Sequence, residues 1–249
     1  MDNTTPGELV LKTHFKVTSA DTDMYTRLRP GALLNFLIQA AIQSADSLGY
    51  GLRGLQKHQL FWVLSRISIE VYRPLKWYEE VEVETWAKDV AKLIYLRDFI
   101  VRDGSGQVVA RSTSGWLAID LMTKRPKKLA GVGAEVFERL RDRHSLEYQP
   151  EKVSGTRGGE LFSIHPTYFD FDLNKHVTST RYLDWMMDTW SFEFHRGHYP
   201  TRLSINYMKE TGPGAQVQLY RQQNEGEEYL FEGIHAHTGK DSFRARIVF

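Results

Sequence analysis

Residues 32–48 read ALLNFLIQAAIQSADSL and stand between Pro30-Gly31 and Gly49. Their apolar side chains recur at three- and four-residue steps, the period of one helix face: Leu34, Leu37, Ile38, Ala41, Ile42 and Ala45. Glycine commonly follows the last residue of a helix, so we expect the helix to end at Gly49. This stretch therefore predicts a long helix whose apolar face other elements must cover.

The segments around this helix are typical of β-strands. Residues 13–19 alternate polar and apolar side chains before it, as a half-buried strand does. After it, strand-like runs occur at 61–64, 67–72, 81–86, 94–101 and 108–119. Asp103-Gly104, between the last two runs, is a hairpin-turn signal. Such a helix is covered best if the antiparallel sheet wraps around it.

The second half of the chain repeats this order of elements. A strand is predicted at 161–165, and a helix from Thr178 or Ser179 to about Phe194. Further strand-like runs follow at 202–208, 216–221, 229–237 and 243–249. One copy is thus a strand, a long helix and four or five strands, and the chain holds two copies.

An overlay of the two halves supports the repeat. Residues 65–69 match residues 201–205 at an offset of 136, and the same register places Val81 on Val217 and Val83 on Leu219. At an offset of 135, three later residues meet their counterparts: Gly104 and Gly239, Ala110 and Ala245, Arg111 and Arg246. We therefore predict an α+β fold of two tandem hotdog domains, each an antiparallel sheet wrapped around a long central helix.

The predicted domains are an N-terminal hotdog at 1–124, a linker at 125–158 and a C-terminal hotdog at 159–249. The linker begins in the basic run Lys124-Arg125-Pro126-Lys127-Lys128. It continues through a short charged helix at 135–143 and a polar, glycine-rich stretch at 150–159. We expect the first domain to bind an apolar ligand and the second to carry chemistry, for the reasons below.

Composition excludes several classes of function. The 249 residues include 32 Lys and Arg against 31 Asp and Glu, and this net charge of +1 favours neither nucleic acid nor a membrane surface as a partner. The absence of cysteine excludes disulfides, thiolate metal sites and a cysteine nucleophile. No apolar run reaches the length of a membrane helix, and Met1 to Lys12 contains no leader-like pattern. A cytoplasmic protein without cofactor or metal is the expectation.

The candidate site lies just before the second predicted helix. Asp172, Asn174 and His176 are spaced by two, which in an extended segment points all three to one side. The free N–H groups and positive end of the following helix lie close by. These groups suit acyl chemistry. The amide and the free N–H groups can bind a developing oxyanion, and the imidazole and the carboxylate can move protons. The alternative is a simple turn and capping segment.

The overlay adds a second carboxylate. It places Glu210, at the end of a predicted strand, on Pro74 of the first half. The first half has Asp21-Thr22-Asp23-Met24-Tyr25 at the corresponding helix entry, without Asn or His. The polar set is therefore confined to one copy, and Glu210 becomes a candidate general base if the fold brings it beside His176.

These residues carry a resemblance to a known family. Residues 172–177, DLNKHV, followed by residues 182–185, YLDW, resemble the signature of the acyl-acyl-carrier-protein thioesterases, which end fatty acid synthesis by hydrolysing the thioester to the carrier protein. Residues 207–211, YMKET, resemble the family's second catalytic segment. First-half stretches at 60–66, 83–86 and 111–116 are also similar, so that the likeness covers roughly residues 13–249.

The resemblance implies a catalytic set of Asp172, Asn174, His176 and Glu210. Plant members often carry a cysteine after this glutamate, where this chain has Thr211, which favours water as the attacking group. The expected location of the acyl chain is between the first helix and its sheet. The lack of a transit peptide favours a bacterial-type member.

The implied partner is an acidic acyl carrier protein bearing a fatty acyl chain. We expect the carrier protein to dock on a local basic patch. Two groups of residues are candidates for it: Arg27, Arg29, Arg53 and Lys57, or the cluster Lys124–Lys128. The sequence leaves open an acyl-CoA thioesterase, a hotdog dehydratase and a non-catalytic acyl-binding protein. It also leaves open chain-length preference, an acyl-Glu210 intermediate and a homodimer.

Overall fold

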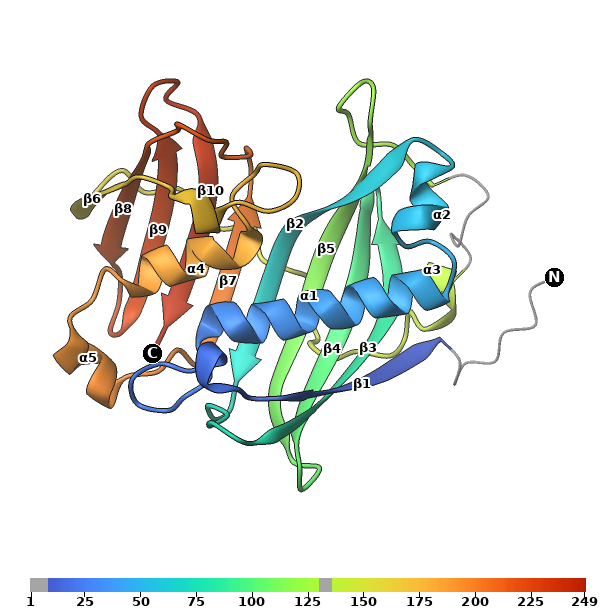
Figure 1. The fold of residues 1–249 in the computed structure, drawn as a ribbon, viewed down its shortest axis with the longest axis horizontal. Helices are drawn as coiled ribbons and strands as arrows, with labels where there is room; N and C mark the ends of the chain where they lie inside the picture. Colours follow the sequence, from blue (N-terminus) through green and yellow to red (C-terminus); the bar gives the residue numbers. More distant parts are fainter. Residues whose placement is uncertain (1–8, 130–135) are drawn as a thin grey trace.

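A single ten-stranded antiparallel sheet runs through both halves of the computed structural model, which describes residues 9–129 and 136–249 (Figure 1). The strand order is β1-β3-β4-β5-β2-β7-β10-β9-β8-β6, so each half contributes five neighbouring strands. The first-half strands are β1 (Val10–Lys16), β2 (Leu60–Val71), β3 (Glu80–Ala91), β4 (Ile94–Asp103) and β5 (Val108–Asp120). The second-half strands are β6 (Glu160–Ile164), β7 (Arg202–Tyr207), β8 (Val217–Gln223), β9 (Glu228–His235) and β10 (Asp241–Val248).

The two halves meet at the antiparallel pair β2–β7, and this pair confirms the predicted repeat. Ser68 lies directly opposite Ser204, its own counterpart at the offset of 136, and their Oγ atoms are 3.0 Å apart. The pair therefore marks a pseudo-twofold axis through the middle of the sheet. Phe15 pairs with Val81 and Ile164 with Val217, which confirms the predicted equivalence of Val81 and Val217.

The predicted offset of 135 for the last strand of each half is wrong by two residues. Ile69 pairs with Ser112, and Ile205, the counterpart of Ile69, pairs with Ala245. The counterpart of Ala245 is thus Ser112, at an offset of 133, instead of Ala110. A shift of two leaves every side chain on the same face of the sheet, which is why the apolar pattern did not reveal the error.

The first predicted helix is α1 (Pro30–Ser47), which lies across the concave face of the first-half sheet (Figure 1). Its Leu34 and Leu37 are fully buried and belong to the same apolar core as Ile67 and Ile69 of β2. The runs predicted at 61–64 and 67–72 form one strand, β2, with a bulge between Leu64 and Arg66. The first half therefore has the predicted layout of a sheet wrapped around a helix.

The second predicted helix is shorter than expected. α4 spans Ser179–Met187, and a separate helix, α5, spans Phe192–Gly197. The Thr189 hydroxyl bonds the Met186 carbonyl, and Ser191 caps α5 by accepting from the Phe194 N–H. Hydroxyl side chains thus compete for backbone groups where the periodicity alone predicted a continuous helix.

Both central helices lie on the same face of the sheet and contact each other (Figure 1). One apolar core runs beneath them and joins α1, α4, β2 and β7. A second core, around Leu60, Tyr95 and Phe137, closes the far end of α1. The remaining short helices are η1 (Ser19–Asp21), α2 (Leu52–Gln56), α3 (Val136–Arg139) and η2 (Tyr168–Asp170).

The connection between the halves crosses the outer face of the sheet. Tyr148 donates to Glu70, the Glu151 N–H donates to Ser68 Oγ, and the Val153 N–H donates to Asn206 Oδ1. Upstream, the Ser145 N–H donates to Asp98, a buried carboxylate that also pairs with Lys88 at 3.0 Å. The segment therefore contacts strands of both halves.

Two sequence predictions fall partly outside the described residues. These are the absence of a leader, which rests on residues 1–12, and the start of the linker helix at 135. Among residues 9–129 and 136–249, no helix combines the length and apolar character needed to cross a membrane.

Gly233 offers a test of the packing. A Cβ there would lie 2.5 Å from Cδ1 of Phe243 and closer still to Cε1, and this ring is fully buried. Gly233→Ala should therefore lower the free energy of unfolding by about 1–3 kcal/mol, measured by denaturant titration. Gly197→Ala is the matched control, because a Cβ at this position would meet no atom within 4 Å. Equal stability of the two variants would contradict this account of β9–β10 packing.

Candidate active site

The loops that lead into α1 and α4 are built alike. Thr18 and Asp21 form a capping box in the first half, and Thr167 and Asp170 form its counterpart 149 residues later. Thr26 and Lys175 both adopt the left-handed region, with φ of 62° and 60°. The bridges Thr22–Leu28 and Phe171–Val177 close the two loops. The first half therefore serves as an internal comparison for the second, residue by residue.

Asp172 shapes the loop through its backbone contacts. Its Oδ1 accepts from the N–H groups of Asn174, at 2.8 Å, and His176, at 3.2 Å. Asp23 does the same for Tyr25 and Arg27. The expected extended segment at 172–176 is thus wrong: the segment is a turn, because an aspartate readily binds the backbone two residues on.

His176 and Glu210 are brought together. Their Nε2 and Oε2 atoms lie 3.2 Å apart, and the two side chains are 39% and 54% exposed. The adjacent backbone holds the segments in place, since the Val177 N–H donates to the Thr211 carbonyl at 2.9 Å. Asn174 lies exposed in the turn between Asp172 and His176. Of the four predicted site residues, His176 and Glu210 are therefore in direct contact. The other two, Asp172 and Asn174, lie in the turn that leads to His176.

The first half has the same backbone contact but lacks the imidazole and the carboxylate. The Leu28 N–H donates to the Leu75 carbonyl, so the counterparts of His176 and Glu210 are Arg27 and Pro74. Arg27 is largely buried and pairs with Asp23 at 2.8 Å. It also donates to the carbonyls of His195 and His198. Arg27 therefore holds α5 to the first half, which makes it a poor docking residue.

A groove of about 590 Å³ opens beside the pair. His176, Glu210 and Lys209 lie on its second-half side, and Lys124 lies on its first-half side. Its floor is apolar and comes from β2 and β5: Phe61, Val63, Leu117 and Ile119. This volume is within the range of small-molecule sites, so the imidazole and carboxylate face a space that can hold a substrate.

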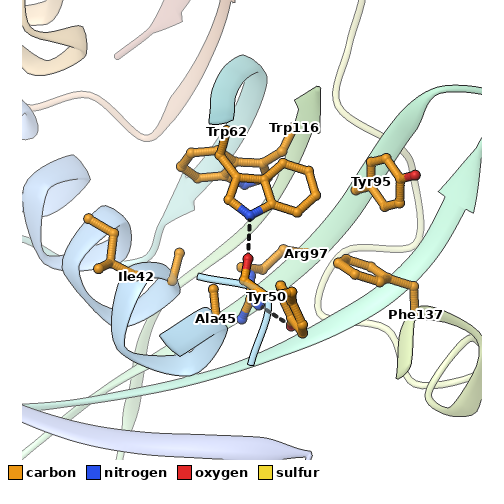
Figure 2. Close-up of a pocket in the computed structure, with 9 residues that line it drawn as sticks. Ile42, Ala45, Tyr50, Trp62, Tyr95, Arg97, Trp116 and Phe137 are labelled. Atoms are coloured by element: carbon orange, nitrogen blue, oxygen red, sulfur yellow. Dashed lines mark hydrogen bonds between the residues drawn. The ribbon is translucent and has the colours of Figure 1, made fainter. Parts of the chain in front are cut away.

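A second, aromatic pocket lies between α1 and the first-half sheet (Figure 2). Trp62, Tyr95, Trp116 and Phe137 surround it, and its volume is about 60 Å³. Trp62 Nε1 donates to the Tyr50 carbonyl, and the buried Arg97 donates to the Tyr50 hydroxyl at 2.8 Å (Figure 2). The volume of this pocket is about a tenth of that of the groove.

Thr211 stands where the resemblance places a cysteine, but it is fully buried. Its Oγ1 lies 2.9 Å from His235 Nε2 and 2.8 Å from Ser242 Oγ. A hydroxyl beside an imidazole resembles an activated nucleophile, yet a buried one cannot reach a substrate. Sequence reasoning missed His235, since it stands alone in a strand and carries no motif.

Titratable groups near the site are shifted by burial and by their partners. Burial, together with Lys209, lowers the pKa of His235. Burial raises the pKa of the Asp170 carboxyl, but bonds from Thr167 and Arg181 outweigh it, so that the pKa is lowered overall. Asp170 is therefore paired with Arg181, at 2.6 Å. Among the described residues, no group of acidic and histidine side chains could hold a metal ion.

Comparisons with known proteins match both halves of the chain to one family. Residues 8–137 match the acyl-ACP thioesterase N-terminal domain, and residues 155–249 match the acyl-ACP thioesterase C-terminal domain. The chain belongs to the acyl-ACP thioesterase family. Its two hotdog halves therefore correspond to the two domains of that family.

Individual relatives are distant in sequence and close in structure. The chain is 24% identical to oleoyl-acyl carrier protein thioesterase 2 of Arabidopsis thaliana, over 80% of this chain and 59% of the relative. It is 26% identical to dodecanoyl-[acyl-carrier-protein] hydrolase of Cinnamomum camphora, over 84% and 58%. The chain thus spans less than two thirds of these curated relatives. An acyl-ACP thioesterase structure from Bacteroides thetaiotaomicron superposes with a TM-score of 0.91 at 25% identity, covering 99% of this chain and 100% of that one.

The turn at Asp172 can be tested without an activity assay. Asp172→Ala should speed amide hydrogen exchange at Asn174 and His176 by about tenfold, the equivalent of one net hydrogen bond. Asp172→Asn keeps an oxygen acceptor and should stay near wild type. Asp23→Ala is the matched control, because it should free Tyr25 and Arg27 instead. Equal exchange in the Ala and Asn variants would contradict a role as backbone acceptor.

Proposed function

We propose that this protein hydrolyses the thioester of fatty acyl-acyl carrier protein to free fatty acid and carrier protein. The supporting observation is the His176–Glu210 contact of 3.2 Å at the edge of a groove, in a chain of the acyl-ACP thioesterase family. A base beside a substrate-sized space is what activation of water requires. The confinement of this pair to one half argues against a purely acyl-binding protein.

The proposed reaction uses water as the nucleophile. Glu210, paired with His176, takes a proton from water as the water oxygen attacks the thioester carbonyl carbon. The proton passes from Glu210 to His176 across their contact, and His176 gives it to the leaving sulfur as the C–S bond breaks. The products are the fatty acid and the thiol of the carrier. Such proton transfer contributes about 10²–10⁴ in rate.

Asn174 and the start of α4 are the proposed oxyanion donors. Asn174 lies exposed two residues before His176, and α4 begins at Ser179, three residues after it. Amide and backbone N–H donors at such a position stabilise the developing negative charge by roughly 3–4 kcal/mol each. Asp172 supports both side chains by fixing the turn that carries them. Attack by Glu210 itself, through an acyl-Glu210 intermediate, stays the alternative pathway.

The groove is the proposed place of the thioester and of the arm that links it to the carrier. In this proposal, the first half (1–124) binds the acyl chain and the second half (159–249) carries the catalytic residues. The segment 125–158 connects them. The aromatic pocket beneath α1 has the apolar lining an acyl chain needs. At about 60 Å³ it is small for such a chain, and the proposal includes movement of the lining side chains when the chain enters.

The proposed carrier contact is the basic rim of the groove. Lys124, from the predicted cluster Lys124–Lys128, and Lys209 both line it. Residues 124–128, Arg53 and Lys57 are exposed. Exposed lysines complement an acidic partner at long range in low salt. The cytoplasm is the proposed location, because the thiol released from the carrier stays reduced there. A homodimer remains a prediction.

Substitution of the proposed base and oxyanion donor tests the mechanism. Glu210→Ala should lower kcat for an acyl-carrier thioester by about 10²–10⁴, and Asn174→Ala by about 10²–10³. Circular dichroism and thermal unfolding serve as folding controls. Full activity in a folded variant would remove that residue from the scheme.

Substrate choice tests the carrier. The rate with acyl-carrier thioesters should exceed the rate with the same acyl group on CoA. It should also fall as salt rises from about 0.05 to 0.5 M, because screening weakens exposed charge pairs. A short neutral thioester should show no such salt dependence. A preference for CoA would favour an acyl-CoA thioesterase, and enoyl product would indicate a dehydratase.

A further inference from the structure

A buried polar cluster lies behind the His176–Glu210 pair. We define the buried junction as Tyr182, Thr211, His235 and Ser242, which are 4%, 0%, 8% and 1% exposed. Tyr182 comes from α4, Thr211 from the segment after β7, His235 from the end of β9 and Ser242 from β10. Burial raises the pKa of Tyr182, and hydrogen bonds with Thr211 and Ser242 oppose that rise. The junction therefore joins four elements without reaching solvent.

Hydrogen bonds join the members of the junction. Ser242 Oγ donates to the Lys209 carbonyl at 3.3 Å and lies 2.8 Å from Thr211 Oγ1. Thr211 Oγ1 in turn lies 2.9 Å from His235 Nε2. Burial and Lys209 lower the pKa of His235, which favours its neutral form.

This chain of bonds fixes the backbone on both sides of Glu210. Lys209 precedes it, and its carbonyl accepts from Ser242 while its N–H donates to the Ser242 carbonyl at 3.2 Å. Thr211 follows it, and its carbonyl accepts from the Val177 N–H, next to His176. Glu210 itself is about half exposed. The backbone of Glu210 is therefore held through the residues on both sides of it.

The first half shows that the fold does not need these hydroxyls. The counterparts of Tyr182, Thr211 and Ser242 are Leu33, Leu75 and Val109, all buried and apolar. Two backbone bonds are common to both halves. Leu28 N–H to the Leu75 carbonyl matches Val177 N–H to the Thr211 carbonyl, and Tyr72 N–H to the Val109 carbonyl matches Met208 N–H to the Ser242 carbonyl. Asp103, the counterpart of His235, pairs with Arg73 instead. The polar junction thus occurs only in the half that carries His176 and Glu210.

Stability does not account for this difference. A satisfied buried polar cluster is seldom more stable than a well-packed apolar one of similar size. A hydrogen-bonded network does, however, fix orientation more narrowly than apolar contacts do. We propose that Thr211, held between His235 and Ser242, is a positioning residue that fixes the Glu210 carboxylate against His176. The proposal rests on the function proposed above for Glu210.

The first experiment reads the contact directly. Ring ¹⁵N and ¹³C signals of His176, assigned with His176→Asn among the nine histidines, are compared between wild type, Thr211→Val, Thr211→Ser and Glu210→Ala. Thr211→Val should move the His176 signals toward those of Glu210→Ala, and Thr211→Ser should restore them. Thr113→Val is the matched control, because it removes another buried hydroxyl, bonded to Asp98 in the first half. It should leave the His176 signals unchanged.

The second experiment uses kinetics. Thr211→Val should lower kcat by about 10- to 100-fold with KM within about twofold, and it should have no further effect in a Glu210→Ala background. A merely structural role would instead add to the loss in that background. If Thr211→Val fails to fold, Ser242→Ala, which removes one member of the same chain of bonds, takes its place with both readouts.

The outcomes separate this inference from the proposed function. Wild-type His176 signals in Thr211→Val, or equal shifts in Thr113→Val, would overturn the positioning role. Additive losses in the double variant would overturn it as well. A wild-type chain that does not hydrolyse acyl-carrier thioesters would refute the proposed function, and the His176 spectra would still decide whether Thr211 positions Glu210.

Discussion

The antiparallel pairing of β2 with β7 is the contact on which the remaining structure depends. It places Ser68 against Ser204 and turns two five-stranded halves into one sheet. Because equivalent strands pair with each other, a pseudo-twofold axis relates the two halves. The first-half strands β2 and β5 consequently line a groove whose His176 and Glu210 come from the second half.

The shared design separates what a half needs for folding from what it needs for chemistry. Both loops have the capping box, the aspartate-bound turn and the left-handed residue before the helix. Only the second adds His176, Glu210 and a buried polar junction. The first uses Arg27 and Pro74 in those places, and Arg27 secures α5. Structural and chemical roles can thus be read from differences within one molecule.

The sequence predicted those features that rest on periodicity and on the repeat. The α1 helix and the equivalence of β2 with β7 follow from apolar spacing and an offset of 136, and the family resemblance pointed to His176 and Glu210 as members of one site. Hydrogen bonds between side chains and the nearby backbone were harder to predict. The Thr189 and Ser191 hydroxyls bond the backbone just after α4, where the helix was expected to continue, and Asp172 accepts from backbone N–H groups. His235 could not be found, because its partners Thr211 and Ser242 lie far from it in sequence and meet it only through strand pairing.

The central strand pair has a consequence for how such a protein can be encoded. Were the two halves separate chains, β2 and β7 would each present an open row of backbone donors and acceptors, and edges of that kind invite association with the wrong chain. Placing both halves on one polypeptide raises the local concentration of the right partner. The covalent connection therefore protects both edges against aggregation and lets the two halves carry different side chains.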